Sequence, residues 1–373
     1  MISIAARFAG LLALAVSASL LFADAASAQQ KGAPKAAQPD AGVRAQGQNV
    51  QLGQPPAVSA PSPNDEITTD PRQHMRNLIS DISAYARSAN SGFVVITTDG
   101  LDLLERVDPV DPSKRAAAVT YIKSIDGVIV PGINFHPPNE RGDFKTEEKV
   151  QTEMLRLIDI GQKRGLRIWS IDYAKDAAMA RDSIRFAIKK SYVPFPSRDP
   201  DERFARIPPG RPLNENPRAI TGLNHVRNFL MLTDTSAWDT QEEFALAVAN
   251  TNYDAVVIDV FHRGRTPMTT RTVESLKYKK LGARRLVLAY MNIGEAESYR
   301  YYWKPGWREG APAFIAAPTN GNPDKYTVQY WDPAWRDVIL GNTNSYLYGI
   351  IKQGFDGVVL DGVEAFRVFE GEQ

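Results

Sequence analysis

Acidic side chains stand at the ends of most of the short apolar segments of this chain. They follow seven such segments and are Asp99, Asp172, Asp234, Asp259, the pair Glu295 and Glu297, Asp332 and Asp361. Carboxyl groups that converge on one site can share the acid, base and nucleophile roles of glycosidic bond cleavage. These residues therefore indicate carboxylate chemistry, provided that the fold gathers the segment ends.

Each acid also has a structural alternative, because aspartate is a common N-cap of the helix that follows a strand. Capping is favoured for Asp332, which precedes Pro333 and a helical stretch, and for Asp234. Asp259 and Asp361 end very apolar runs with no convincing helix start behind them. A functional role is favoured for these two.

Aromatic residues are dense in the same part of the chain. They are Tyr290, Tyr299, Tyr301, Tyr302, Trp303, Tyr330 and Trp331. Aromatic faces pack on sugar rings, and an acidic site attracts a cationic substrate such as a sugar with a free amine. The alternative is packing between barrel and helices, which we expect for at least half of them. Glu297 and Arg300 are three residues apart, so they either shape a subsite or only form an ion pair along a helix.

Other site chemistries lack their residues. The four histidines show no metal-ligand spacing and there is no cysteine, so we expect no metal. Neither a Gly-x-Ser-x-Gly elbow nor a glycine-rich phosphate loop occurs, so we expect no cofactor.

The elements that must position these acids alternate between short apolar strands and helical patterns. The eight predicted strands span 93–97, 127–130, 167–171, 228–232, 255–259, 285–291, 327–331 and 357–361. Such an alternation over about 300 residues predicts a single (β/α)8 barrel over 69–373, with the acids at its carboxyl-terminal mouth. The stretch YVPFP (192–196) is either a ninth strand or a loop, and its prolines favour a loop.

The first 68 residues differ from the rest. Residues 1–28 combine Arg7, an apolar run and Ala26-Ser27-Ala28, which predicts a cleaved signal peptide, with an uncleaved N-terminal anchor as the alternative. Residues 29–68 are rich in Pro, Ala and Gln and predict a disordered linker. We expect a periplasmic or secreted protein without stable membrane insertion after leader cleavage. The net charge of +1, without basic clusters, gives no indication of nucleic-acid binding.

Four strings in this order resemble glycoside hydrolase family 114, the endo-α-1,4-polygalactosaminidase-like (β/α)8 proteins. They are NYDAVVIDVF, RLVLAYMNIGEAESYRYYW, YTVQYWDPAW and GFDGVVLDGVEAF, and the most specific is GEAE-x-x-R-x-x-W at Gly294 to Trp303. The resemblance covers roughly residues 228–369. Elements that follow the last string in the family resemble residues 75–104 and 121–135 here. The chain is therefore predicted to be circularly permuted, with 93–97 beside 357–361.

The resemblance implies that Asp361 is a catalytic carboxylate. It also implies a partner Glu after the strand at 127–130, where this chain has Val130-Pro131-Gly132, and an Asn where Asp99 stands. Two interpretations follow. Another acid (Glu364, Glu295, Asp172 or Asp99) is the partner, or the barrel binds sugar without cutting it.

The sequence thus predicts a secreted or periplasmic glycoside hydrolase that cleaves α-1,4-linked galactosamine-containing polysaccharide, or an oligosaccharide of amino sugars. The alternative is a catalytically inactive carbohydrate-binding barrel in exopolysaccharide handling. The predicted catalytic residues are Asp361, Glu295 and Asp259. The predicted substrate-binding residues are Asp99, Asp172, Tyr290, Glu297, Arg300, Trp303, Tyr330, Trp331, Asp332 and Glu364.

Overall fold

A computed structural model describes residues 70–138, 144–198, 203–319 and 322–371 of the protein. The predicted signal peptide (1–28) and linker (29–68) lie outside these residues. None of the helices in the described ranges is both long and apolar enough to cross a membrane.

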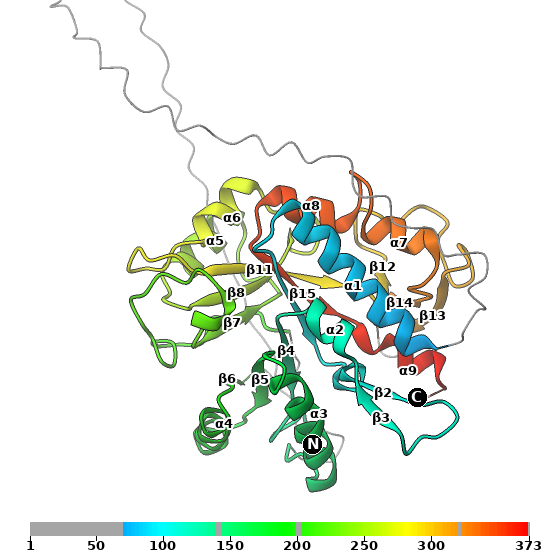
Figure 1. Ribbon diagram of the computed structural model, residues 1–373. Coiled ribbons are helices and arrows are strands. Elements are labelled where there is room, and N and C mark those ends of the chain that lie inside the picture. The colour runs from blue at the N-terminus through cyan, green and yellow to red at the C-terminus, as the bar shows by residue number, and fades with distance from the viewer. Residues whose placement is uncertain (1–69, 139–143, 199–202, 320–321, 372–373) are drawn as a thin grey trace, which may run out of the picture. The chain divides into compact units, whose positions relative to one another are not determined.

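Eight parallel strands form the central sheet (Figure 1). They are β1 (Val94–Thr98), β4 (Gly127–Pro131), β5 (Arg167–Tyr173), β6 (Val193–Ser197), β7 (Phe229–Leu232), β8 (Ala255–Asp259), β11 (Leu286–Asn292) and β15 (Gly357–Asp361). Their order in the sheet is β6-β5-β4-β1-β15-β11-β8-β7, which is the sequence order once β15 is placed beside β1. The sheet is therefore a nearly closed barrel, and the predicted (β/α)8 fold is confirmed.

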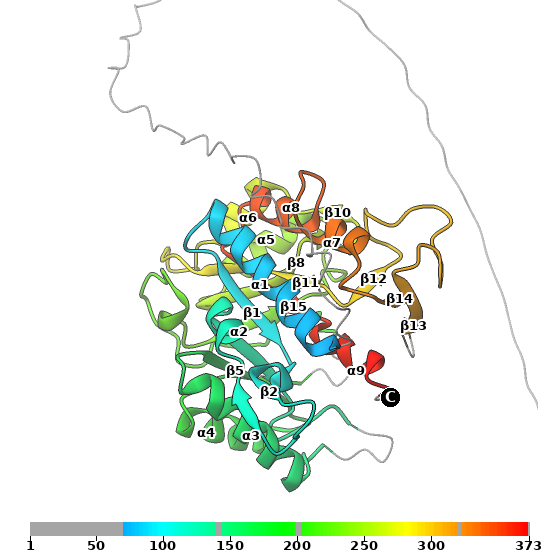
Figure 2. The same ribbon diagram turned by 45° about the vertical axis from the view of Figure 1, so that its right-hand side comes forward.

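Helices surround the sheet, as the two views in Figures 1 and 2 show. They are α1 (Pro71–Ala89), α2 (Val119–Ser124), α3 (Glu148–Gln162), α4 (Ala177–Lys189), α5 (Gln241–Ala249), α6 (Thr270–Leu276), α7 (Pro333–Ile339), α8 (Tyr346–Gln353) and α9 (Phe366–Phe369). In α1, Asp70 caps the first turn by accepting the N–H of Gln73, and Pro71 follows the cap. Its apolar positions, from Met75 to Ile82, are fully buried against the barrel.

Strand β15 is sealed on both sides. Val94 pairs with Gly357 on one side and Leu288 pairs with it on the other. Residue 357 must be glycine, because a Cβ atom there would lie 2.4 Å from the carbonyl oxygen of Val94. The predicted adjacency of 93–97 and 357–361 is confirmed, and the circular permutation stays a prediction.

Two strand assignments made from the sequence are wrong. Residues 327–331 are not a barrel strand, since β14 (Asn322–Val328) is antiparallel to β12 (Glu295–Glu297) and β13 (Ile315–Thr319) in a separate small sheet. The eighth barrel strand is β6, which contains the two prolines that favoured a loop.

The prolines of β6 explain why it was missed and why it lies at an edge. The carbonyl of Ser197 accepts the N–H of Ala174, the residue that follows β5. The backbone groups of the alternate residues Pro194 and Pro196 therefore face away from β5 and toward β7. Prolines have no N–H to donate. Within the described residues no hydrogen-bonded register joins β6 to β7. Aromatic packing closes this seam, with Phe229 of β7 5.4 Å from Phe195 and 4.5 Å from Trp169 between ring centroids.

Three smaller antiparallel units interrupt the barrel pattern. The hairpin of β2 (Glu105–Val107) and β3 (Arg115–Ala117) follows the 3-10 helix η1 (Leu101–Leu104). The hairpin of β9 (Phe261–His262) and β10 (Thr266–Pro267) follows β8, and the β12-β14-β13 sheet follows β11. The last two units extend from the carboxyl ends of β8 and β11, so they add side chains to the barrel mouth.

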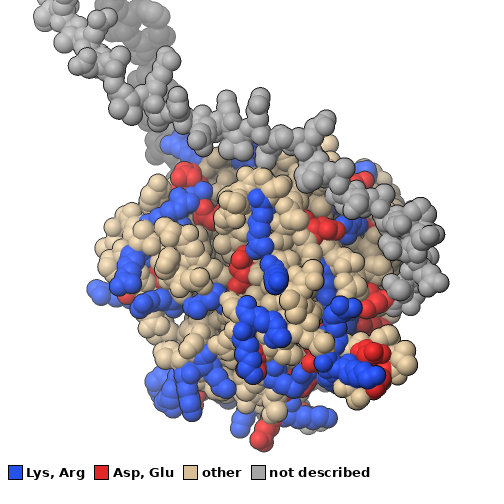
Figure 3. Space-filling view, in the orientation of Figure 1, with Lys and Arg blue, Asp and Glu red and all other residues tan. Residues whose placement is uncertain are grey.

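Charged side chains are interspersed on the face seen in Figure 3, with Lys and Arg densest in the lower part, where α3 and α4 lie. This face is not generally acidic, in keeping with the net charge of +1. The acids gathered at the barrel mouth are therefore a local feature of the fold.

Candidate active site

Asp361 ends β15 and is partly exposed at the barrel mouth. Its carboxylate accepts hydrogen bonds from the hydroxyl of Tyr290 on β11 and from the N–H of Gly362. Burial raises the pKa of Asp361, while these two hydrogen bonds and the nearby ammonium of Lys325 act in the opposite direction. Burial and Asp361 also raise the pKa of Tyr290, which keeps this hydroxyl protonated as a donor.

Asn292 pairs with Asp361 in the sheet and shapes the turn after β11. Its Oδ1 atom accepts the N–H groups of Gly294 (3.1 Å) and Glu295 (3.0 Å), and its Nδ2 atom donates to Glu295 Oε2 (2.7 Å). A Cβ atom on Gly294 would lie 1.9 Å from the carbonyl oxygen of Gly362, so no side chain fits there. Close packing therefore requires glycine at position 294, and the hydrogen bonds of Asn292 hold the Glu295 carboxylate in place.

Arg300 is the centre of a buried ion-pair network. Its NH1 atom lies 2.9 and 3.0 Å from the two carboxylate oxygens of Asp259, which ends β8, and its Nε donates to Glu297 Oε2 at 2.5 Å. The side chain of Arg300 is only 3% exposed. Glu297 lies in strand β12 and the next residues form a turn, so the ion pair is present but not on a helix.

Lys325 of β14 adds a second cation to this network. Its Nζ atom lies 3.6 Å from a carboxylate oxygen of Glu295 and 3.6 Å from one of Glu297. Glu297 also accepts the hydroxyl of Tyr299 at 2.5 Å. Burial raises the pKa of Glu297, but the ion pairs with Arg300 and Lys325 outweigh it, and the pKa is lowered. For Asp259 burial outweighs Arg300, and the pKa is raised.

Asp99 and Glu364 form a second acidic group next to Asp361. Asp99 follows β1 in a left-handed conformation (φ 61°), and Glu364 lies in the 3-10 helix η3 (Val363–Ala365) after β15. Burial and the charge of Glu364 raise the pKa of Asp99 well above its usual range, and burial also raises that of Glu364. Glu364 has an ion pair with Arg367 at 3.0 Å. A left-handed non-glycine residue at a barrel mouth is typical of strained functional positions.

The position where the resemblance implies a glutamate holds Pro131 at the end of β4. Strand β4 pairs with β1, and Asp99 N–H donates to the Ile129 carbonyl at 2.8 Å. Asp99 therefore stands one strand away from the position of the missing acid, on the side toward Asp361.

Several predicted site residues have other partners in the structure. Asp172 is fully buried and accepts four hydrogen bonds, from Asn134 N, Asn134 Nδ2, Phe135 N and Ser183 Oγ, at 2.6 to 3.1 Å. These bonds hold the loop after β4, which is a structural role. The predicted capping role of Asp332 is confirmed, since it accepts the N–H of Ala334 at the start of α7. Asp234 does not cap α5, because Thr240 does.

The aromatic residues divide as the packing alternative predicts. Tyr330 is fully buried and donates to the carbonyl of Pro71, and Trp331 stacks on His74 and Phe369. Trp303 packs on Tyr326 with ring centroids 5.1 Å apart. Of the predicted aromatic residues, Tyr290 is the one that contacts Asp361.

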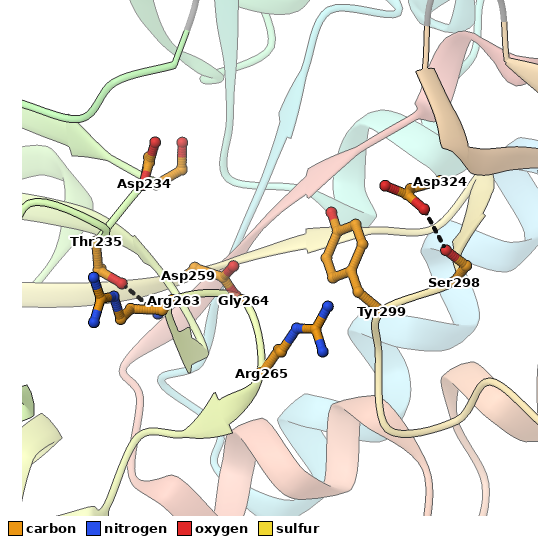
Figure 4. A pocket seen from close by; sticks show the side chains of 10 residues that line it. Asp234, Thr235, Asp259, Arg263, Gly264, Arg265, Ser298, Tyr299 and Asp324 are labelled. Atoms are coloured by element: carbon orange, nitrogen blue, oxygen red, sulfur yellow. Dashed lines mark hydrogen bonds between the residues drawn. The ribbon is translucent and has the colours of Figure 1, made fainter.

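A cavity of about 510 Å³ opens beside Asp259, between the ends of β7 and β8 and the small sheet (Figure 4). Its lining residues are Thr233, Asp234, Thr235, Asp259, Arg263, Gly264, Arg265, Ser298, Tyr299 and Asp324. No group of three or more His, Asp or Glu within the described ranges is arranged to hold a metal ion.

Sequence reasoning missed Asn292 and Lys325 as members of the site, and it named Tyr299 only among the aromatic residues of the predicted mouth. Asn292 and Tyr299 lie within the Tyr290 to Trp303 stretch that carries the resemblance, so this stretch was a usable signal. Lys325 comes from an antiparallel strand that is paired with β12. No local pattern around Lys325 indicates this pairing.

Residues 229–373 match the family model described as glycoside-hydrolase family GH114. The resemblance to this family is confirmed for these residues. The GH114 segment begins at the first residue of β7 and includes β8, β11 and β15, so it supplies Asp259, the Arg300 network and Asp361. Asp99 and Pro131 lie outside it.

Curated relatives match a similar share of the chain. An uncharacterized protein of Deinococcus radiodurans is 36% identical over 121 residues, which is 32% of this chain and 36% of the relative. An uncharacterized protein of Methanocaldococcus jannaschii is 34% identical over 164 residues, or 41% and 46% of the two chains. One from Thermotoga maritima is 28% identical over 144 residues, or 39% and 43%. The chain thus spans less than half the length of these relatives.

Proposed function

We propose that this protein is a secreted or periplasmic glycoside hydrolase that cleaves α-1,4-linked galactosamine-containing polysaccharide. The observation that carries the proposal is the placement of Asp361. It ends a central barrel strand within the GH114 segment, it contacts a protonated tyrosine, and no cation in the described ranges forms an ion pair with it.

Asp361 and Asp99 divide the two carboxyl roles. Glycoside hydrolysis uses one protonated carboxyl as the general acid and one ionised carboxylate as the nucleophile or base. Burial raises the pKa of Asp361, but the hydrogen bonds from Tyr290 and Gly362 and the nearby Lys325 ammonium oppose this shift, so Asp361 ionises more readily than Asp99. Burial and Glu364 raise the pKa of Asp99 well above its usual range and favour its protonated form. This difference between the two environments is the usual sign of an acid and base pair.

An amino sugar suits the electrostatics of this end of the barrel. Glu364 forms an ion pair with Arg367, whereas Asp361 has no ion pair within the described ranges. A substrate ammonium group would supply Asp361 with a positively charged partner.

Pro131 favours a second candidate function. A barrel without the glutamate that the resemblance implies at this strand end would bind glycan without cleaving it, as a carbohydrate-binding protein in exopolysaccharide handling. The two functions differ in turnover and share substrate binding, so one experiment separates them.

The experiment is incubation of the purified protein with partially deacetylated α-1,4-galactosaminan, with new reducing ends as the measurement. Wild type, Asp361→Asn and the control Asp182→Asn are compared. Asp182 lies on α4, and its one ion pair with the described residues is an exposed i,i+3 pair with Arg185, so this variant makes the same chemical change away from the site. We expect reducing ends from wild type and the control but only background from Asp361→Asn.

Equal release by wild type and Asp361→Asn would contradict the assignment of Asp361. Background release by all three proteins, together with a rise in melting temperature on adding the polymer, would favour the binding function.

A further inference from the structure

We propose that the cavity beside Asp259 is a subsite for an uncharged sugar ring of the glycan, selected by Arg265 and Asp324. This inference rests on the proposed function, since it names the unit that binds next to the catalytic carboxylates. The cavity has a volume of about 510 Å³, and its lining includes both basic and acidic side chains (Figure 4).

Tyr299 supplies a fixed aromatic surface in the cavity. Its hydroxyl donates to Glu297, and the Arg300 guanidinium carbon lies 5.0 Å from the ring centroid, so the ring is held from behind by the buried network. A Cβ atom at Gly264 would lie 3.7 Å from this ring, in van der Waals contact. Glycine at this position therefore leaves the edge of the ring uncovered. Aromatic side chains that are held rigidly are suited to pack against a sugar ring at a low entropic cost.

Most charges around the cavity are already paired. Asp259 pairs with Arg300, Asp234 with Arg203 at 2.8 Å, and Arg263 with Asp239 at 3.5 Å. These pairs contribute little net charge to a bound molecule. They leave the selectivity of the cavity to the charged lining residues that are not paired.

The remaining charged residues of the lining are one cation and one anion. The guanidinium of Arg265 forms no hydrogen bond or ion pair within the described part of the chain, and it points toward Tyr299 in Figure 4. The carboxylate of Asp324 accepts one hydrogen bond, from Ser298 Oγ at 3.0 Å, and has no ion pair in the same described part of the chain. A ligand with a full positive or negative charge would meet one of these with like sign. An uncharged ring can instead offer a carbonyl oxygen to Arg265 and a hydroxyl to Asp324.

The position of the cavity fits two successive rings of one chain. Asp259 ends β8 and Asp361 ends β15, with β11 and Tyr290 between them. Neighbouring strands are about 4.8 Å apart, so these two strand ends are separated by about 10 Å. A glycan across the mouth would place an amino sugar near Asp361 and an N-acylated ring, whose amide is uncharged, in the cavity.

The test is isothermal titration calorimetry in an Asp361→Asn background, which prevents turnover. The probes are two α-1,4-linked galactosamine tetrasaccharides, one fully N-acetylated and one fully deacetylated. Arg265→Gln removes the unpaired cation. Arg271→Gln is the matched control, because Arg271 is an exposed arginine on α6 outside the cavity.

We expect Arg265→Gln to weaken binding of the acetylated tetrasaccharide about tenfold, because a charged hydrogen bond to the acyl oxygen is lost. Binding of the deacetylated tetrasaccharide should be unchanged or tighter, since the variant removes a like charge. Compared with Arg265→Gln, Asp324→Asn should weaken binding of the acetylated tetrasaccharide less and binding of the deacetylated tetrasaccharide more. Arg271→Gln should alter neither.

Equal effects of Arg265→Gln and Arg271→Gln on the acetylated probe would overturn the inference. So would equal losses for both probes in Arg265→Gln, or no binding of the acetylated probe by the Asp361→Asn protein. The proposed function is judged separately by reducing ends from the wild-type chain. If wild type cleaves the polymer and Arg265→Gln has no selective effect on binding, only the subsite proposal is wrong. If Arg265→Gln selectively weakens binding of the acetylated probe and wild type does not cleave, only the proposed hydrolase activity is wrong.

Discussion

Two groups of acids lie at the same end of the barrel and differ in their counter-charges. Asp259, Glu295 and Glu297 surround Arg300 and Lys325, and each has an ion pair with one of these cations. Asp361 and Asp99 have no such pair within the described ranges, and Glu364 shares Arg367 with Asp102. Both groups are largely removed from water.

The difference shows how Arg300 and Lys325 affect the ionisation of the carboxyl groups beside them. Burial favours the neutral form of any carboxyl group, and an adjacent cation opposes this preference. The cations prevail at Glu297, whose pKa is lowered, whereas burial prevails at Asp259, whose pKa is raised. Around Arg300 the result is a set of charged groups that stabilise one another and hold the turn after β11. Around Asp361 the pKa values of Asp361 and Asp99 are raised, and the proposed function assigns proton transfer to a glycosidic oxygen to this group.

The largest expected effect separates the two groups by activity. Asp361→Asn should lower kcat by about 10⁴-fold with little loss of stability, because the proposed function makes Asp361 a reacting group and it has no ion pair within the described ranges. Asp259→Asn should change kcat by less than about tenfold but lower the free energy of unfolding, since Arg300 loses a buried partner. Reducing-end kinetics and urea denaturation measure the two quantities. The reverse order of kcat losses would assign the chemistry to Asp259.

The second prediction breaks the paired group at its centre. Arg300→Met leaves Asp259 and Glu297 buried without their shared cation, which should lower the free energy of unfolding by about 3–5 kcal/mol. Arg336→Met is a suitable comparison, because its ion pair with Asp81 lies between partly exposed side chains and should contribute about 1 kcal/mol or less. Similar losses for both variants in urea denaturation would contradict the special role of Arg300.

The third prediction uses pH to distinguish the groups. The pKa of Asp99 is raised in the folded state, so its contribution to stability is present below its ordinary value of about 4 and is lost as pH rises through the folded pKa. Asp99→Asn should therefore raise the melting temperature at neutral pH and have less effect near pH 4.

Glu297 should show the opposite pH dependence. Its folded-state pKa is lowered, so its contribution is present above its ordinary value of about 4.3 and is lost as pH falls through the folded pKa. Glu297→Gln should lower the melting temperature at neutral pH, with a difference from wild type that shrinks in acid. Melting curves from pH 3 to 8 test both variants, and a parallel response of the two would remove the distinction.

The smallest expected effect concerns an acid that belongs to neither group. Asp332→Ala should lower the free energy of unfolding by about 1 kcal/mol through loss of the cap of α7, with kcat unchanged. Asp332→Asn should restore the stability, because asparagine caps equally well. A fall in kcat for either variant would instead support the predicted role of Asp332 in substrate binding.

The sequence predicts the barrel well because most of its strands are apolar runs that stand between helices. It fails where tertiary context overrides the local pattern. The prolines of β6 are tolerated because their backbone groups face the seam with β7. Residues 327–331 have strand-forming residue types because residues 327 and 328 belong to β14 of the small sheet. Neither fact is visible in a window of the sequence.

The sequence predicts the positions of the acids at the strand ends but not the residues that form ion pairs and hydrogen bonds with them. Asp99, Asp259 and Asp361 follow their strands as the barrel rule requires. The pairing of Asp259 with Arg300 spans 41 residues, and Lys325 reaches Glu295 and Glu297 from β14. These contacts depend on how the small antiparallel sheet folds over the mouth. The burial of Tyr330 under Pro71 depends likewise on a helix distant in the sequence.

The seam at β6 and β7 gives the barrel one direction in which it can open. The amides of Pro194 and Pro196 have no hydrogens to donate across the gap, whereas β1 and β15 are paired from Val94 to Thr97. The GH114 segment begins at this seam. The barrel therefore consists of two halves that are hydrogen-bonded to each other between β1 and β15 but have no hydrogen-bonded register between β6 and β7 in the described residues. In hydrogen–deuterium exchange we expect the backbone amides of β7 to exchange well before those of β15. Brief separation along this line would leave the Asp361 side of the mouth intact.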